Sequence, residues 1–565
     1  MLNKIRSILK RKNPTKNKDI DPDEIFLDSK NLPAFDVNQF EGRMERPISQ
    51  SVFNFLVIFL FLIGIVFVYK LWNLQVVEGE KFRIRSDNNN LRNTIIFADR
   101  GVIYDRNNVP IVWNAINSQT NDFSLRIYAT STGLSTTLGY VKYPSKDSSG
   151  IYYQNRYDPI DGLEKVYDTI LSGMNGIKII ETDVKGNIVS ESVIQKPVDG
   201  DNLPLSIDLN LQRKLNESLL DIADRAGYRG GSGVIMDIAT GEILAISNFP
   251  EYSSQVMTDG SDSKKINAWV NNKNYPFLNR AINGLYTPGS IMKIFIAMGV
   301  LDLAVINPSK QIVSTGSISI PNPFIKDKPS IFLDWKAHGP VDLRRAIAVS
   351  SNVYFYEVTG GFESQPGIGI LNIEKYTRMF GFGTTTKINF SGELPGTIPS
   401  PEWKKKNFNG DEWHVGDTYN TAIGQYGFQV TPLQAVRAVG AIGSGGILVT
   451  PTLIKGQIGP KSMIELNSDF YRIVKEGMRL GVTEGTSAAL NFPFVEVVSK
   501  TGTAQLGVSK DEVNSWVIGF WPYKNPKYAY AIVMERGSRN NQFGAVLVMR
   551  ELFDWVNIYA SEYLQ

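Results

Sequence analysis

Hydrophobic residues form one long run near the N-terminus and several shorter runs towards the C-terminus. The first run comprises the eighteen residues 52–69 and is interrupted only by Asn54 and Gly64. A helix of that length spans about 27 Å, which matches the hydrocarbon core of a bilayer. The run has no polar face, and Lys70, Leu71 and Trp72 follow it in place of a small-residue cleavage site. We therefore predict an uncleaved membrane anchor.

Short, mostly apolar runs predict strands at both ends of the C-terminal half. Residues 233–238 and 242–246, joined through Thr240-Gly241, are typical of a β-hairpin. Further strands are predicted at residues 494–500, 516–521 and 528–534, and helices at 208–220, from 290, at 343–349, from 432 and at 547–564. Strands from both ends of a region with helices between them indicate an antiparallel sheet flanked by helices, an α+β fold.

Composition narrows the chemistry that this region can perform. Among 565 residues the net charge is only +3, which implies no nucleic acid partner. Cysteine is absent and the only histidines are His338 and His414, so we expect no disulfide framework and no metal site. No Gly-x-Ser-x-Gly elbow occurs, and we expect both histidines to be structural. A serine nucleophile in this chain would therefore use a lysine base more readily than a histidine.

The strongest candidate for such a pair is Ser290 with Lys293. Pro288 and Gly289 break the chain just before Ser290, and an apolar run follows, so Ser290 is predicted at the first turn of a buried helix. Lys293 lies three residues later on the same helical face. Burial and the helix N-terminus both lower a lysine pKa towards the neutral amine. We interpret Ser290 as a nucleophile and Lys293 as its base.

Ser350-Ser351-Asn352 follows the helix predicted at residues 343–349. It places a hydroxyl, on Ser350, and a carboxamide, on Asn352, close together at the end of an element. Taken alone, this sequence is also typical of a surface turn, and it gains meaning only from its order after Ser290.

Lys500-Thr501-Gly502-Thr503 is predicted to end a strand, where alternate side chains point into one cleft. One cation and two hydroxyls are suited to hold a carboxylate. Gly502 would allow a substrate backbone to approach closely.

In this order the three motifs resemble those of the penicillin-recognising enzymes. The chain is similar to a class B penicillin-binding protein, a monofunctional peptidoglycan D,D-transpeptidase. Further similar segments are Arg100-Gly101 to Asp105-Arg106, Asn279-Arg280-Ala281, residues 394–403 and residues 416–434. Asp334-Trp335 with His338, and residues 353–356, favour the elongation type over the division type. Gly424-Gln425-Tyr426-Gly427 departs from the Gly-Gln-Gly expected in the family.

The resemblance implies a role for each motif residue. Ser290 would attack the carbonyl between two terminal D-alanines of a peptidoglycan stem peptide, and an amine of a second stem peptide would resolve the acyl-enzyme. Lys293 would accept the serine proton, with its pKa lowered by about three units. Ser350, assisted by Lys500, would relay a proton to the leaving amine. Asn352 would hold Lys293 and a substrate amide.

Substrate binding is implied at the third motif. The backbone N–H groups of Ser290 and Thr503 would form the oxyanion hole. Thr501 and Thr503 would bind the terminal carboxylate beside Gly502. β-Lactams would acylate Ser290 as mimics of D-alanyl-D-alanine, and no cofactor is implied.

The resemblance also implies a domain order and partners. Residues 1–50 would be a basic cytoplasmic tail, 51–71 the anchor, 72–225 a non-catalytic, dimerisation-type pedestal and 226–565 the transpeptidase domain. The basic tail favours an N-terminus inside, with the catalytic domain periplasmic or extracellular. The expected partners are a membrane glycosyltransferase of the shape, elongation, division and sporulation (SEDS) family and other elongation-complex proteins.

Four alternatives share these features. A β-lactamase or penicillin sensor would not need the anchor and pedestal. A D,D-carboxypeptidase would differ only in its use of water as the acceptor. A scaffold that activates the glycan polymerase, and a division-type transpeptidase, are compatible with the same motifs.

Overall fold

The computed structural model divides into two compact units, which meet between Asn90 and Leu91. It describes residues 49–118, 122–148, 150–182, 188–322, 325 and 327–565. The predicted cytoplasmic tail, residues 1–50, lies almost wholly outside these residues.

The first unit holds the predicted anchor. Helix α2 (Gln50–Trp72) continues as a π-helix, η3 (Asn73–Val77), and all of its residues lie away from the protein core. Within the described residues, it is the one helix long and apolar enough to cross a membrane. A second helix, α3 (Gly79–Asn90), follows at the start of the region assigned to the pedestal. The sequence did not predict this helix, because the polar segment has no repeating apolar face that would indicate one.

The second unit begins with two small sheets and short ladders in the pedestal region. One sheet has the order β1-β9-β10 and the other β11-β2-β3-β4. The strands are β1 (Leu91–Ile96), β9 (Gly176–Thr182), β10 (Ile188–Gln195), β11 (Leu203–Pro204), β2 (Ile103–Tyr104), β3 (Pro110–Ala115) and β4 (Leu125–Tyr128). The ladders and helices are β5 (Val141–Lys142) with β8 (Asp158–Pro159), β6 (Ser145–Lys146) with β7 (Tyr152–Gln154), α4 (Ser135–Leu138), α5 (Gly162–Val166) and α6 (Asp168–Leu171).

A buried ion-pair cluster holds the pedestal together. Arg100 Nε lies 2.5 Å from Glu164 Oε2, and Arg100 Nη1 lies 2.7 Å from Asp168 Oδ1. Arg126 Nε lies 2.9 Å from the other oxygen of Glu164. Both ion-pair partners of Arg100 come from α5 and α6. The Arg100 to Arg106 motif is structural.

The catalytic region is built on a five-stranded antiparallel sheet of order β13-β12-β22-β21-β20. Its strands are β12 (Gly230–Asp237), β13 (Ile243–Phe249), β20 (Val498–Leu506), β21 (Glu512–Trp521) and β22 (Tyr528–Ser538). The predicted hairpin and the α+β class are confirmed. Strand β20 begins later than predicted and continues past Lys500-Thr501-Gly502-Thr503, so this motif lies within an edge strand and does not end one.

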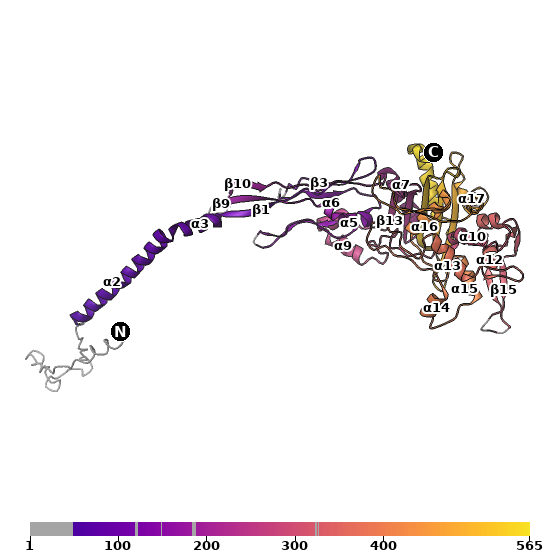
Figure 1. The fold of residues 1–565 in the computed structure, drawn as a ribbon, viewed down its shortest axis with the longest axis horizontal. Helices are drawn as coiled ribbons and strands as arrows, with labels where there is room; N and C mark the ends of the chain where they lie inside the picture. The colour runs from indigo at the N-terminus through magenta and orange to yellow at the C-terminus, as the bar shows by residue number, and fades with distance from the viewer. Residues whose placement is uncertain (1–48, 119–121, 149, 183–187, 323–324, 326) are drawn as a thin grey trace, which may run out of the picture. The chain divides into compact units, whose positions relative to one another are not determined.

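Alternate residues of the central strands face two separate hydrophobic cores. On β22, Ala531 and Val533 contribute to one core, and Tyr530 and Ile532 to the other. Helices α7 (Leu209–Ala226) and α18 (Ala545–Tyr559) cover one face, while α16 (Pro432–Ser444) and α17 (Ser468–Thr483) cover the other (Figure 1). The continuous apolar runs in the sequence of these strands therefore reflect a sheet buried on both sides.

Helices and small ladders connect β13 to β20. The helices are α8 (Ser254–Asp259), α9 (Ser263–Val270), η4 (Gly289–Met292), α10 (Lys293–Asp302), α11 (Leu343–Val349), α12 (Asn352–Gly360), α13 (Ile370–Met379), α14 (Pro401–Asn407), α15 (Val415–Ala422) and η5 (Ala488–Leu490). The ladders are β14 (Ile312–Ser314) with β17 (Gly339–Val341), β15 (Ser317–Ile320) with β16 (Ser330–Leu333), and β18 (Ile447–Val449) with β19 (Lys461–Met463). The chain ends in η6 (Ser561–Leu564).

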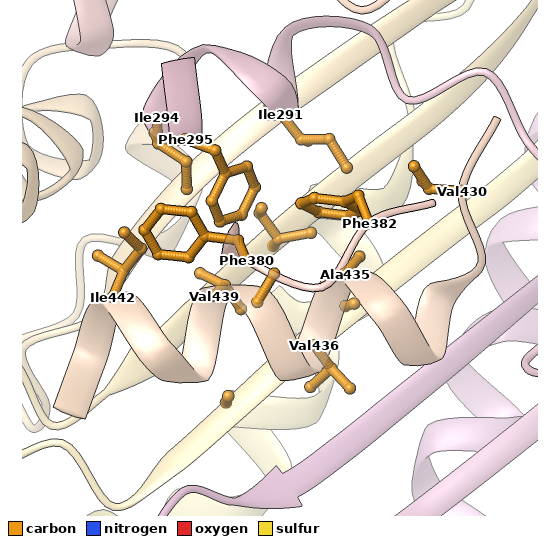
Figure 2. Packing of buried hydrophobic residues seen from close by; sticks show 14 of the residues in the cluster. Ile291, Ile294, Phe295, Phe380, Phe382, Val430, Ala435, Val436, Val439 and Ile442 are labelled. Atoms are coloured by element: carbon orange, nitrogen blue, oxygen red, sulfur yellow. The ribbon is translucent and has the colours of Figure 1, made fainter. Parts of the chain in front are cut away.

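The helix that carries Lys293 is fixed by aromatic packing. Phe295 of α10 lies 5.1 Å from the ring of Phe380 and 5.0 Å from that of Phe382, between centroids. Val439 and Ile442 of α16 close this core from below (Figure 2). Each fully buried side chain of this size stabilises the fold by about 1.5 to 3 kcal/mol. The cluster therefore holds the start of α10 rigidly.

Candidate active site

Ser290 lies in the short 3₁₀-helix η4, which leads directly into α10. Gly289 adopts a left-handed φ of +59°, and a Cβ there would meet Thr503 O at 2.9 Å. A Cβ on Gly502 would meet Pro288 O at 2.7 Å. The two glycines thus allow η4 to lie against the edge strand β20. The backbone that fills the space beside Gly502 is therefore the protein's own, and not that of a substrate as the sequence predicts.

Lys293 is completely buried, and its amine is held by two carbonyl oxygens. Its Nζ donates to Ser350 O at 2.8 Å and to Asn352 Oδ1 at 2.7 Å. Burial lowers the pKa of Lys293 to about 7, although the charge on Asp334 acts in the opposite direction. A neutral amine has two N–H donors and one lone pair. Because the two carbonyls take both donors, the lone pair remains available to accept a proton.

Among the described residues, no hydrogen bond joins Lys293 to Ser290. The two side chains nevertheless project from adjacent turns of one continuous helical segment, three residues apart. Their pairing as nucleophile and base stays a prediction, supported by the lowered lysine pKa.

Ser350 lies between the two buried lysines. Lys500 Nζ donates to Ser350 Oγ at 2.9 Å and to Thr501 O at 2.9 Å, while Lys293 Nζ lies 3.5 Å from the same hydroxyl. Burial, reinforced by the charge on Lys293, lowers the pKa of Lys500 well below its ordinary value. Ser350 itself adopts a left-handed φ of +59°, which is rare for a residue other than glycine and is typical of functional sites. The three motifs therefore converge on this hydroxyl.

Asp334 supports the second motif, a role that the sequence did not reveal. Its Oδ2 accepts hydrogen bonds from Ser351 Oγ at 2.8 Å, Val353 N at 3.1 Å and Ser314 Oγ at 3.1 Å. Burial raises the pKa of Asp334, but hydrogen bonds and the charge on Lys293 outweigh burial and lower it overall. Asp334 thus remains an anion that fixes the start of α12. No pattern of spacing in the sequence indicates this contact.

The two histidines lie outside the proton path. His338 Nε2 is 3.6 Å from Asp334 Oδ1, and burial lowers the pKa of His338. His414 precedes α15 as its N-cap. No group of three or more His, Cys, Asp or Glu within the described residues is placed to hold a metal ion.

The threonines of the third motif lie on one face of β20. Thr501 is half-buried, and its Oγ1 lies 2.6 Å from Thr486 Oγ1. Thr503 is exposed, two residues further along the strand. Thr486, in the loop after α17, is a second residue that sequence reasoning missed. It joins the face that was predicted to bind a carboxylate.

The loop that departs from the family pattern carries an aromatic cluster. Gly289 N donates to Gly424 O at 3.0 Å, so this loop borders the nucleophile. Tyr426 stacks on Phe408 with 5.9 Å between ring centroids, and its edge contacts Trp403 and Trp413. Gly424 thus lies beside the residue that precedes the nucleophile, while the additional residue, Tyr426, packs into the aromatic cluster.

The fold and the meeting of the three motifs match the serine acyltransferase that the sequence predicts. Residues 231–553 match the model of the penicillin-binding protein transpeptidase domain, and residues 116–205 match the penicillin-binding protein dimerisation domain. The chain therefore belongs to the penicillin-binding protein transpeptidase family.

Three relatives illustrate the similarity. The chain is 25% identical over 600 residues to peptidoglycan D,D-transpeptidase MrdA of Escherichia coli (strain K12), covering 87% of this chain and 91% of that protein. It is 30% identical over 420 residues to MrdA of Acinetobacter baumannii, covering 70% of this chain and 59% of that protein. The PBP2 of Helicobacter pylori, solved in complex with MreC, matches at 25% identity with a TM-score of 0.66, covering 83% and 99% of the two chains.

Proposed function

We propose that this protein is a membrane-anchored peptidoglycan D,D-transpeptidase that acts in cell-wall elongation. The observation that carries the proposal is the buried Lys293 amine, whose pKa is lowered to about 7 directly after Ser290 in a fold of this family. The similarity to MrdA proteins and to a PBP2 supports the elongation role.

The first half of the reaction forms an acyl-enzyme. Ser290 Oγ attacks the carbonyl carbon between two terminal D-alanines while Lys293 Nζ accepts the hydroxyl proton. The backbone N–H groups of Ser290 and Thr503 stabilise the oxyanion, each by about 3 kcal/mol. The C–N bond then breaks. Ser350, whose hydroxyl Lys500 holds at 2.9 Å, passes its proton to the departing D-alanine amine and regains one from protonated Lys293, whose Nζ lies 3.5 Å away.

The second half forms the cross-link. The amine of a neighbouring stem peptide attacks the ester and loses its proton through the same groups, and Ser290 regains its hydroxyl. Asn352 holds Lys293 and a substrate amide throughout, while Thr501 and Thr503 bind the donor's terminal carboxylate before it leaves. β-Lactams acylate Ser290 because they present the same acyl group.

The proposed setting is the cell envelope. The anchor helix α2 crosses the plasma membrane once, with the basic N-terminus in the cytoplasm and the catalytic region outside. A PBP2 relative was solved with MreC, which supports elongation-complex partners for this chain. A SEDS-family glycosyltransferase is the proposed enzyme that supplies the glycan strands.

A fluorescent penicillin followed by peptide mass spectrometry tests the proposal. The wild-type protein should carry a stable adduct on Ser290, and Ser290→Ala should carry none. Ser261→Ala is a matched control, because Ser261 and Lys264 form another Ser-x-x-Lys sequence in a polar segment. An adduct that hydrolyses within seconds would instead identify a β-lactamase. An unlabelled wild-type protein would contradict the assignment of the nucleophile.

A further inference from the structure

A second polar cavity lies away from Ser290, between α13, α16 and the β18–β19 ladder. Its volume is about 740 Å³, within the range of small-molecule sites. Its lining includes four basic residues, Arg378, Lys387, Arg437 and Lys461, and no Asp or Glu among the described residues. It shares no residue with the catalytic motifs.

Three of these four cations are available to a ligand. Arg378 is paired with Glu374 at 2.7 Å, one turn away on α13. Within the described part of the chain, the amines of Lys387 and Lys461 make no hydrogen bond or ion pair. Arg437 Nε donates to Val449 O at 2.9 Å, which leaves both terminal nitrogens of its guanidinium without a described partner.

The surroundings favour an anion over a neutral ligand. Burial lowers the pKa of Arg437, so its charge is poorly solvated; the charge on Glu393, which lies outside the lining, acts in the opposite direction but makes no ion pair with Arg437 among the described residues. The two terminal nitrogens of a guanidinium match the two oxygens of a carboxylate or phosphate. Lys387 adopts a left-handed φ of +67°, which is rare for lysine and sets its side chain against this cavity. Thr384 and Thr450 add hydroxyl groups to the lining.

The cavity adjoins both the pedestal and the core of the nucleophile helix. Asn389, in its lining, donates to the hydroxyl of Tyr167 in the pedestal at 3.1 Å. Phe380 and Phe382, which flank its wall residue Gly381, pack on Phe295 of α10 (Figure 2). A ligand here would therefore contact the segments that connect the pedestal to the catalytic helix.

We propose that this cavity is a second binding site, for a ligand that carries two or more carboxylate or phosphate groups. Two sources present this chemistry at the cell envelope: the free carboxylates of a peptidoglycan stem peptide, and a pyrophosphate. Binding at this site depends on Arg437, Lys387 and Lys461 and not on chemistry at Ser290. A negative binding result would therefore leave the proposed function untouched, and the reverse also holds.

Isothermal titration calorimetry on the full chain in detergent tests this site. One titrant is a disaccharide-tripeptide, which lacks D-alanyl-D-alanine and so cannot acylate Ser290; the other is sodium pyrophosphate. The double variant Lys387→Gln with Lys461→Gln removes two charged amines that make no described hydrogen bond or ion pair. The variant Arg437→Lys keeps the positive charge but removes the two terminal nitrogens of the guanidinium. Lys405→Gln, an exposed lysine of α14 outside the cavity, is the matched control.

We expect one titrant to bind the wild type with a one-to-one stoichiometry and more weakly at higher salt. The double variant should bind at least tenfold more weakly, Arg437→Lys several-fold more weakly, and Lys405→Gln as the wild type does. Binding of the tripeptide alone identifies the stem-peptide carboxylates, and binding of pyrophosphate alone identifies phosphate. Penicillin labelling of each variant verifies its fold. If neither titrant binds, or if the double variant binds as well as the wild type, the proposal is wrong.

Discussion

The amine of Lys293 and the side-chain oxygen of Asn352 lie 2.7 Å apart, at the point where the first two motifs meet. Asn352 is a neutral acceptor, so it orients the amine without adding a charge that would favour its protonated form. The negative charge of Asp334 acts to raise the pKa of Lys293, but burial, which lowers this pKa, has the larger effect. Two substitutions can therefore shift this pKa in opposite directions.

The variant Asn352→Asp should raise the pKa of Lys293. Because the base works only when it is neutral, the wild-type rate of acylation by penicillin should fall about tenfold per pH unit below pH 7. This fall in rate is the acidic limb of the pH–rate profile. A carboxylate 2.7 Å from the amine should move the limb about one to three pH units towards higher pH. Acylation rates from pH 5.5 to 9.5 measure the shift, and exposed Asn267→Asp should leave the limb unchanged. An unshifted limb in Asn352→Asp would mean that another group is the base.

The variant Asp334→Asn should move the same limb to lower pH, because it removes the charge that favours protonated Lys293. It should also lower the plateau rate and reduce the free energy of unfolding by about 1 to 3 kcal/mol, since hydrogen bonds to a charged acceptor are lost. Asp342→Asn is the control, because Asp342 caps α11 and asparagine caps a helix equally well. A limb that moves upwards in Asp334→Asn would refute this assignment.

Replacement of Glu164 by glutamine should destabilise the pedestal strongly. It leaves the buried guanidinium groups of Arg100 and Arg126 without their shared anion, which costs about 3 to 5 kcal/mol. The pKa of Glu164 is lowered, because the two arginines outweigh burial, which acts to raise it. The stabilisation from ionised Glu164 is therefore fully present above its pKa of 4.5 in the unfolded chain. It is lost as the pH falls through the lower pKa of the folded protein.

Urea denaturation at pH 7 and pH 4 measures both effects. The wild type should lose stability on acidification, and Glu164→Gln should lose less. Glu217→Gln provides the comparison, because Glu217 forms an exposed pair with Lys214 on α7. A change of under 0.5 kcal/mol in Glu164→Gln would show that the cluster does not hold the pedestal.

The aromatic cluster that includes Tyr426 should depend on the ring of this residue. The variant Tyr426→Ala removes the contacts with Phe408, Trp403 and Trp413 and should reduce stability by about 1 to 3 kcal/mol. Tyr426→Phe keeps the ring and should remain within about 0.5 kcal/mol of the wild type. Thermal denaturation of the two variants separates ring packing from the hydroxyl. Equal losses of stability in Tyr426→Ala and Tyr426→Phe would show that the hydroxyl of Tyr426, and not its ring packing, stabilises the loop.

Local sequence patterns identified most elements of the catalytic region. The apolar runs at residues 516–521 and 528–534 predicted β21 and β22, and Pro432 marked the first residue of α16. The prediction of helix 208–220 matches α7, whose N-cap is Asp208. These signals are local, because strand and helix periods follow from which side chains are buried on one element.

Other features have no local signal. Helix α3 is polar and carries no apolar period, so no local pattern predicts it. The motif at Lys500 lies inside a strand whose length depends on pairing with β21. Asp334 and Thr486 reach the site from loops, where spacing predicts no contact.

The sequence by itself determined the anchor, the element types and the order of three motifs that mark a family. Only the tertiary structure brought Ser350 and Lys500, 150 residues apart, to within 2.9 Å and buried the two lysines there. Periodicity reports whether a side chain is buried, but not which distant group is buried with it. The lysine pKa values depend on that shared loss of solvent, and so the chemistry of the site is a property of the fold.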